Sequence, residues 1–211
     1  MEDIFDLSVS KKELEFVRSG LNIDLEVSAD IAETFGNIPY IGSLIKLGRL
    51  ANKFQDLYFI RKLARFLEKE QDIPDEEKEK FLRSIDKKKR KKMYEYLTHY
   101  LLRAEDDAKA DIMGMIYCER VYGRITDDMF LRLCSVVDRI FVSDLKYMKQ
   151  YIQPSSETNY ITNNLLSCGL LDQVHPFVQG ESLNMGGEYM LNAVGKSLYS
   201  ILDSKHWFDP V

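Results

Sequence analysis

The sequence contains few of the residues that interrupt secondary structure or form covalent cross-links. Its 211 residues include only 5 prolines, 11 glycines and 3 cysteines. Long disordered linkers are usually rich in proline or glycine, so their scarcity argues against such linkers. Three widely spaced cysteines are too few for a disulfide framework. Because Cys118, Cys134 and Cys168 each lie in an apolar, helix-like context, we predict that they are buried, reduced thiols.

A long hydrophobic run is also missing. The longest stretch without a charged residue, from 158 to 171, has 14 residues, and the apolar stretch from 34 to 45 has 12, whereas a membrane-spanning helix needs about 20. The opening residues MEDIFDL are acidic where a signal peptide has a basic region. We therefore predict cytoplasmic residence. The hydrophobic fraction of 45% is ordinary for a globular protein and supplies enough material for a packed core.

The chain has no excess of positive charge. Its formal net charge of −5 disfavours nucleic acid as a partner of the chain as a whole. The charge is unevenly distributed, because residues 1–35 carry nine acidic and three basic residues, whereas residues 40–67 carry six basic residues and one acidic residue. The sequence therefore predicts an acidic N-terminal arm ahead of a basic segment.

The basic segment has the pattern of a long amphipathic helix, with apolar residues recurring at helical spacing from 41 to 67. Such a helix is most often the core of a bundle. Basic amphipathic helices also bind membrane surfaces or partner proteins. In that case the contact would be made by Ile41, Leu44, Ile45, Lys46, Arg49 and Lys53. We hypothesise that the acidic arm covers this helix until a trigger reaches the arm or the C-terminal tail, so deletion of residues 1–35 should raise the affinity for anionic lipid.

Strand-like alternation is missing before Gln153, and the chain predicts one helix after another. We expect a mainly α fold, in which a multi-helix bundle over 36–152 follows the acidic arm 1–35 and precedes a small module over 153–211. Within the bundle, helix signals such as Pro74 and a stop signal at Gly123 delimit the elements. The expected helices include 74–85, 91–104, 107–123, 127–142 and, capped by Ser143, 144–152.

The C-terminal module contains a helix ending at Gly169, extended pieces at 170–174 and 188–191, and a final helix capped by Asn192. This order resembles the end of a winged-helix domain, with Tyr189, Asn192 and Gly195 at the matching positions. Residues 151–211 nevertheless carry six acidic and two basic residues, and the helix that would enter a DNA groove has no Lys or Arg. Because DNA affinity rests mainly on contacts to phosphates, we expect this module to dock a protein or to serve the fold.

Six consecutive basic residues, from 87 to 92, follow Asp86. Such a run suggests contact with phosphate or nucleic acid. It is also typical of a solvated turn between two helices, which we favour. If nucleic acid binds this chain, we expect the contact here, at Lys87, Lys88, Lys89, Arg90, Lys91 and Lys92.

Motifs for chemistry are missing as well. His99, His175 and His206 have no Cys or His at the spacing of zinc ligands. The three aspartates at 106, 107 and 111 break the calcium-loop pattern, and we interpret them as helix-start residues and a solvated face. No phosphate-binding glycine loop is present. We therefore predict no catalytic residues, no cofactor and no metal site, and a protein that is not an enzyme.

Four segments together resemble a group of bacterial proteins with an α-helical body and a winged-helix-like tail, similar to the abortive-infection alpha group. They are IPYIGSLIKLG, RKLARFL, GRITDDMFLRLCSVVDRIFVSDL and YMLNAVGKSL. The resemblance implies a connection with phage defence.

We accordingly expect a bacterial cytosolic interaction protein with a protein partner, which reaches an anionic membrane surface as a peripheral protein on activation. Homo-oligomers are compatible with this. The alternatives are a nucleic-acid-associated regulator that uses the basic run and the winged-helix-like tail, and an accessory subunit that docks a larger enzyme.

Overall fold

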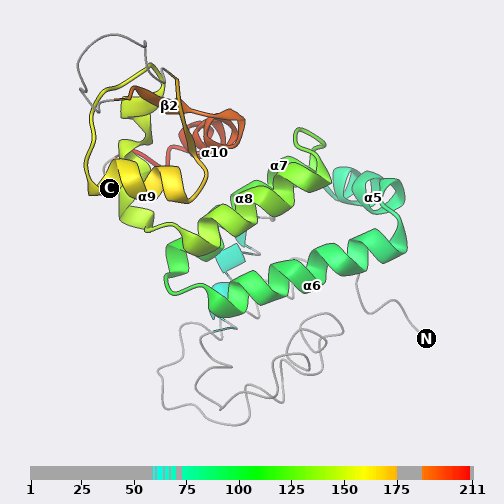
Figure 1. Ribbon diagram of the computed structural model, residues 1–211. Coiled ribbons are helices and arrows are strands. Elements are labelled where there is room, and N and C mark those ends of the chain that lie inside the picture. The colour runs from blue at the N-terminus through cyan, green and yellow to red at the C-terminus, as the bar shows by residue number, and fades with distance from the viewer. Residues whose placement is uncertain are drawn as a thin grey trace, which may run out of the picture. The chain divides into compact units, whose positions relative to one another are not determined.

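The computed structural model describes residues 59, 61–63, 65–66, 68–69, 73–174 and 187–209. The chain divides into two compact units, 1–126 and 127–211. The prediction of a mainly α fold with a small C-terminal β-hairpin is confirmed (Figure 1).

The N-terminal unit contains α5 (Asp75–Ser84), α6 (Lys87–Arg103) and α7 (Asp107–Val121), preceded by helical residues between 59 and 69. The short α5 leads into α6, and α7 returns along the unit so that it packs against α5 (Figure 1). α7 is buried on nearly its whole circumference, which makes it the central helix of the described part of this unit. Its Tyr117 contacts the rings of Phe66 and Phe81, with ring centroids 5.3 and 6.1 Å apart.

The ends of these helices follow local signals. α5 begins directly after Pro74, as predicted. The carboxylate of Asp86 accepts hydrogen bonds from the backbone N–H groups of Lys88 and Lys89, so the basic run forms the first turns of α6. The prediction of a turn at 87–92 is therefore wrong, because these residues begin a helix that Asp86 caps. α7 is capped by Asp106 and ends before Gly123, whose φ of +71° suits glycine.

The C-terminal unit contains α8 (Asp127–Arg139), the 3₁₀ helix η1 (Val142–Tyr151), α9 (Tyr160–Ser167), β1 (Leu171–Gln173), β2 (Tyr189–Leu191) and α10 (Ala193–Ser204). This unit starts well before residue 153, where the sequence placed the boundary of the C-terminal module. α8 and η1 belong to it because α10 packs against both. Its core is formed by apolar side chains of these elements, including Phe130, Leu133, Leu145, Tyr151, Leu165, Leu198 and Leu202.

The segment after α8 is a 3₁₀ helix and is not capped by Ser143, contrary to expectation. Its cap position is Phe141, and the Ser143 hydroxyl donates to the Asp144 carboxylate instead. Ten residues are long for a 3₁₀ helix. Tertiary hydrogen bonds hold both of its ends, since Asp144 accepts from the Asn164 amide at 2.7 Å and the Tyr151 and Thr162 hydroxyls lie 2.7 Å apart.

The two short strands form an antiparallel pair in which Leu171 faces Leu191 and Gln173 faces Tyr189. Tyr189 also forms a bridge with Ser155, so β2 lies between β1 and Ser155. Asn192 caps α10, as predicted, and its side-chain amide also donates to the Gly169 carbonyl at 3.0 Å. Within the described residues no helix is long and apolar enough to cross a bilayer.

Candidate functional site

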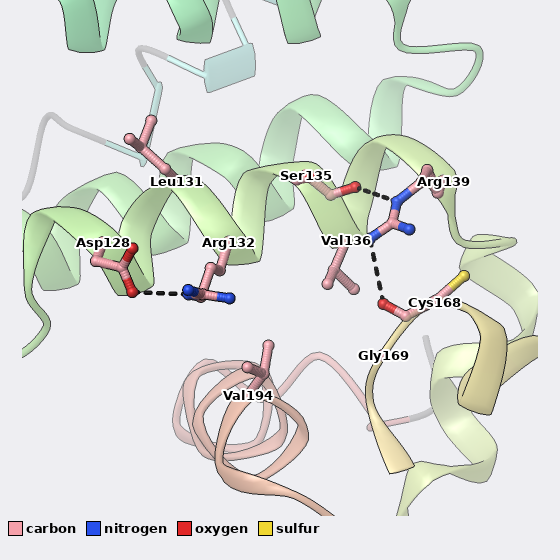
Figure 2. Close-up of a pocket in the computed structure, with 9 residues that line it drawn as sticks. All are labelled: Asp128, Leu131, Arg132, Ser135, Val136, Arg139, Cys168, Gly169 and Val194. Carbon is pink, nitrogen blue, oxygen red and sulfur yellow. Dashed lines mark hydrogen bonds and ion pairs between the residues drawn. The ribbon is translucent and has the colours of Figure 1, made fainter. Parts of the chain in front are cut away.

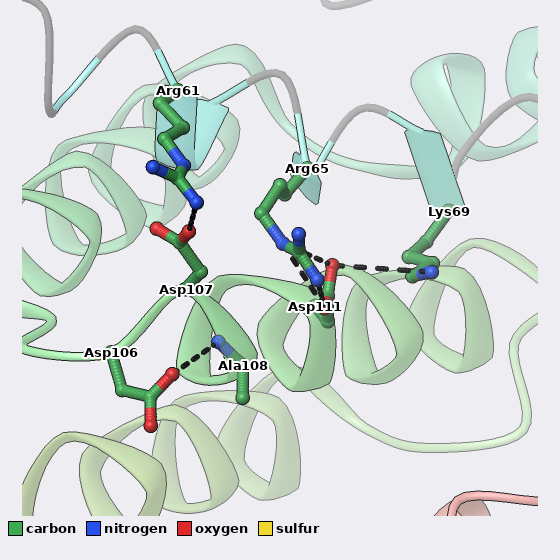
Figure 3. A network of polar contacts seen from close by, with 7 residues as sticks. All are labelled: Arg61, Arg65, Lys69, Asp106, Asp107, Ala108 and Asp111. Carbon is green, nitrogen blue, oxygen red and sulfur yellow. Dashed lines mark hydrogen bonds and ion pairs between the residues drawn. The ribbon is translucent and has the colours of Figure 1, made fainter. Parts of the chain in front are cut away.

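A row of ion pairs joins the described helical residues between 59 and 69 to α7 (Figure 3). The Arg61 Nη2 atom lies 2.6 Å from Asp107 Oδ2. One turn later, the Arg65 Nε atom donates to both carboxylate oxygens of Asp111 at 3.2 Å, and its Nη2 atom donates to the same carboxylate. Lys69 Nζ approaches Asp111 at 3.9 Å. Because the partners are spaced by one turn on each helix, the two helices run side by side in the same direction. We call these five residues the charged ladder.

The two steps of the charged ladder differ in burial. The Asp111 side chain is only 6% exposed and the Arg65 side chain is 39% exposed. In the first step, Arg61 is 56% and Asp107 24% exposed. The hydrogen bond to Asp111 raises the pKa of Arg65 above its usual value, so its charge is permanent. The expected solvated position of Asp111 is therefore wrong, because Arg65 and Lys69 cover its carboxylate.

Next to the charged ladder, the backbone of α7 closely approaches the backbone at Phe66. A Cβ atom on Gly114 would lie 2.7 Å from the Phe66 carbonyl oxygen, so this position of α7 has no room for a side chain. One turn later the Cys118 thiol donates to the Lys69 carbonyl oxygen at 3.0 Å. Phe59, Leu63 and Phe66 are almost completely buried. The described end of the predicted basic helix is thus part of the core of the N-terminal unit.

Lys62, which lies outside the charged ladder, also contacts another helix of the unit. Lys62 is 8% exposed, and its ammonium group donates to the Leu102 carbonyl oxygen near the end of α6 at 3.4 Å. Burial lowers the pKa of Lys62, and the nearby charge of Asp107 partly opposes this effect. Arg61, Lys62 and Arg65 therefore all contact other parts of the N-terminal unit.

The residues predicted to bind a membrane or partner lie outside the described residues. They are Ile41, Leu44, Ile45, Lys46, Arg49 and Lys53. The charged ladder was not predicted from the sequence. Arginines four residues apart on one helix and aspartates four residues apart at the start of another are a complementary pattern, and this pattern is the signal that points to it.

The predicted nucleic-acid contact at 87–92 lies on α6. Lys88, Lys89 and Lys92 are exposed, and the Lys92 ammonium group lies over the Tyr96 ring at 5.7 Å from its centroid. Lys87, Arg90 and Lys91 belong to the same helix, and their side chains lie outside the described residues.

The three cysteines are free and buried, as predicted. Burial raises the pKa of the Cys134 thiol well above its ordinary range, so this thiol is a poor nucleophile. In the described part of the chain, no group of three His, Cys, Asp or Glu residues is placed to hold a metal ion. Of the histidines, His206 pairs with Asp209 at 3.1 Å.

Comparisons with protein-family models, with curated proteins and with solved structures find no match for this chain. The resemblance to the abortive-infection alpha group stays a prediction.

Proposed function

We propose that this chain is a non-enzymatic bacterial cytosolic interaction protein in which a basic helix is held against α7 and released toward an anionic partner. The observation that carries this proposal is the charged ladder. It places two arginines of the predicted basic helix against two carboxylates of the same unit. These arginines remain partly exposed, so an external anion has access to them while the helix is docked.

Release of the basic helix from α7 costs free energy, and this cost determines how strongly a partner must bind to release it. Burial of a large apolar side chain stabilises the docked state by roughly 2 kcal/mol, and Phe59, Leu63 and Phe66 are all buried. Their sum of about 6 kcal/mol corresponds to a released population of about four molecules in a hundred thousand. The partner must therefore supply a comparable binding free energy, which keeps the helix docked until that partner is present.

Phosphate-bearing surfaces supply such a free energy. Arginine binds phosphate oxygens in the same bidentate geometry that it uses for carboxylates, so lipid phosphates can replace the partners of Arg61 and Arg65. The apolar face of the helix would then lie among acyl chains. The residues predicted for this contact, from Ile41 to Lys53, precede the charged ladder in the chain.

Co-sedimentation of the full chain with vesicles tests the proposal. The double variant D107N/D111N should bind anionic vesicles at least about tenfold more tightly than the wild type, because a hydrogen bond to a charged group contributes about 1.5–3 kcal/mol. The control E77Q/E79Q removes two carboxylates from ion pairs on the surface of α5 and changes the net charge equally. Equal binding by both double variants would leave the charge change as the cause and refute control by the charged ladder. Binding to neutral vesicles alone would refute the anionic partner, and binding to neither would redirect the search to a protein partner.

For the C-terminal unit we propose a winged-helix-like module that docks a protein. Support comes from the order of α9, β1, β2 and α10 and from the position of β2 between β1 and Ser155. α9 has no basic residue, and its first residue, Tyr160, is 78% exposed. Aromatic residues are enriched at protein interfaces, so α9 is suited to an accessory role on a larger protein. Loss of a captured partner in Y160A, with retention in K149Q, would support this role; identical capture by both variants would contradict it.

A second candidate function, nucleic-acid association, is favoured by the exposure of Lys88, Lys89 and Lys92 on α6. Neutralising these three residues should reduce the salt dependence of binding to single-stranded DNA in fluorescence anisotropy. If the triple variant and the wild type bind alike, α6 is not the contact.

A further inference from the structure

A pocket with a volume of about 320 Å³ lies within the C-terminal unit (Figure 2). Its walls are one face of α8, the turn that follows α9 and the first turn of α10. The volume is at the small end of the range of ligand sites, which is about 300–1,000 Å³. The lining residues that carry the argument are Asp128, Arg132, Arg139, Cys168, Val136 and Val194.

The two arginines of the pocket differ in how their charge is balanced. Arg132 Nε donates to Asp128 Oδ2 at 2.7 Å, so its charge has a partner. Arg139 donates from Nε to the Ser135 carbonyl oxygen at 3.1 Å and from Nη2 to the Cys168 carbonyl oxygen at 3.4 Å. Both acceptors are neutral carbonyl oxygens, so among the described contacts no carboxylate balances the positive charge of Arg139. A guanidinium has five N–H donors, and these two bonds leave about three for a ligand.

The rest of the pocket is apolar in part. Figure 2 shows Val136 pointing from α8 toward Val194 at the start of α10. The Arg139 contact with the Cys168 carbonyl closes one end, and the pair of Asp128 with Arg132 lies at the other. Arg139 is exposed, so water solvates its free donors when the pocket is empty. An inorganic ion would pair with Arg139 and leave the valine walls without contacts, whereas an uncharged hydrocarbon would contact the valines and make no use of the Arg139 donors.

We propose that this pocket binds a small organic anion, with one phosphate or carboxylate group on Arg139 and a compact apolar body between Val136 and Val194. The anion is favoured over a cation because the one carboxylate in the lining, Asp128, is already paired with Arg132. An oxyanion with two free oxygens matches the forked donors of a guanidinium. This site lies wholly within the C-terminal unit and does not depend on release of the basic helix.

Nuclear magnetic resonance of the ¹⁵N-labelled full chain tests the site, with phenyl phosphate as the probe. Phenyl phosphate should shift amide signals within 128–139, 168–169 and 193–195. It should bind about tenfold more tightly than inorganic phosphate or benzyl alcohol, because each of these offers only half of the contacts. R139Q should weaken binding about tenfold or more. The control K149Q, which removes an exposed positive charge outside the pocket, should bind as the wild type does.

Three outcomes would overturn the proposal. They are amide shifts that fall outside these segments, equal affinity for inorganic phosphate, and wild-type affinity in R139Q. Because R139Q also loses the bond to the Cys168 carbonyl, V194F provides an independent variant that fills the pocket and leaves its charges unchanged. It should weaken phenyl phosphate binding severalfold, and unchanged binding in V194F overturns the proposal even if R139Q does not fold.

Discussion

Replacement of Asp111 by asparagine is the most informative perturbation of the N-terminal unit. Asp111 is the buried member of the charged ladder, and it accepts hydrogen bonds from Arg65 and lies within 3.9 Å of the Lys69 ammonium. Asparagine has nearly the same shape but no charge. The substitution therefore leaves two positive charges against α7 without creating a cavity, and any loss of stability reports on electrostatics.

The size of the effect follows from burial. Removing one partner of a fully buried ion pair costs about 3–5 kcal/mol, whereas an exposed pair contributes about 0–1 kcal/mol. Asp111 is 6% exposed but Arg65 is 39% exposed, so water still solvates part of the guanidinium. We expect a loss of about 2–3 kcal/mol for D111N. For D107N, whose pair with Arg61 is much more exposed, we expect less than about 1 kcal/mol.

Urea unfolding followed by far-ultraviolet circular dichroism measures both variants. With a slope of about 2 kcal/mol per molar urea, the D111N midpoint should fall by about 1 M and the D107N midpoint by less than half of that. Trp207, the single tryptophan, lies in the C-terminal unit and gives a fluorescence signal specific to that unit. A D111N shift no larger than that of D107N would refute the assignment of Asp111 as the central contact of the charged ladder.

Three further predictions concern the same unit and the thiols. G114A should destabilise by about 1–2 kcal/mol in urea unfolding, because the clash with the Phe66 carbonyl outweighs the helix propensity gained; a stabilised G114A would contradict the close approach. K62M should stabilise by about 1 kcal/mol at neutral pH, since it removes a buried charge. The pKa of Lys62 is lower in the folded state than in the unfolded state, so the folded protein loses this proton first as pH rises. The stability advantage of K62M should therefore shrink as pH rises from the folded pKa toward the unfolded value of about 10.4. An advantage independent of pH would argue against a charged Lys62. The thiols should react with a disulfide reagent only on unfolding, and fast native labelling would contradict the burial of Cys118, Cys134 and Cys168.

Local signals made most of the helix ends predictable. Pro74 and Gly123 lie where a helix begins and ends, and Asn192 caps the final helix through its own side chain. These signals act over a few residues, so they can be recognised in a single sequence. The basic run at 87–92 was misassigned because its charge suggested a turn, whereas the Asp86 cap makes it helical.

Features that depend on tertiary contacts were not predictable in the same way. The burial of Asp111 depends on residues more than forty positions earlier in the chain, and no local pattern separates it from a solvated aspartate. The 3₁₀ geometry of η1 depends on Asn164 and Thr162 of α9. The pocket beside Arg139 forms only when α8, the turn after α9 and α10 come together. In each case long-range packing decides the environment of a residue whose local sequence is ordinary.

Hydrogen–deuterium exchange of the wild-type chain, with and without anionic vesicles, tests the central claim most directly. Without vesicles, amides in 59–69 should be protected to a degree similar to those of α7, because both helices belong to one core. Addition of anionic vesicles should increase exchange at Asp107–Val121 of α7 and change exchange in 59–69, since release uncovers the face of α7 that the basic helix occupies. Neutral vesicles should change neither segment. Unchanged exchange in both segments with saturating anionic vesicles would contradict release of the helix toward an anionic surface.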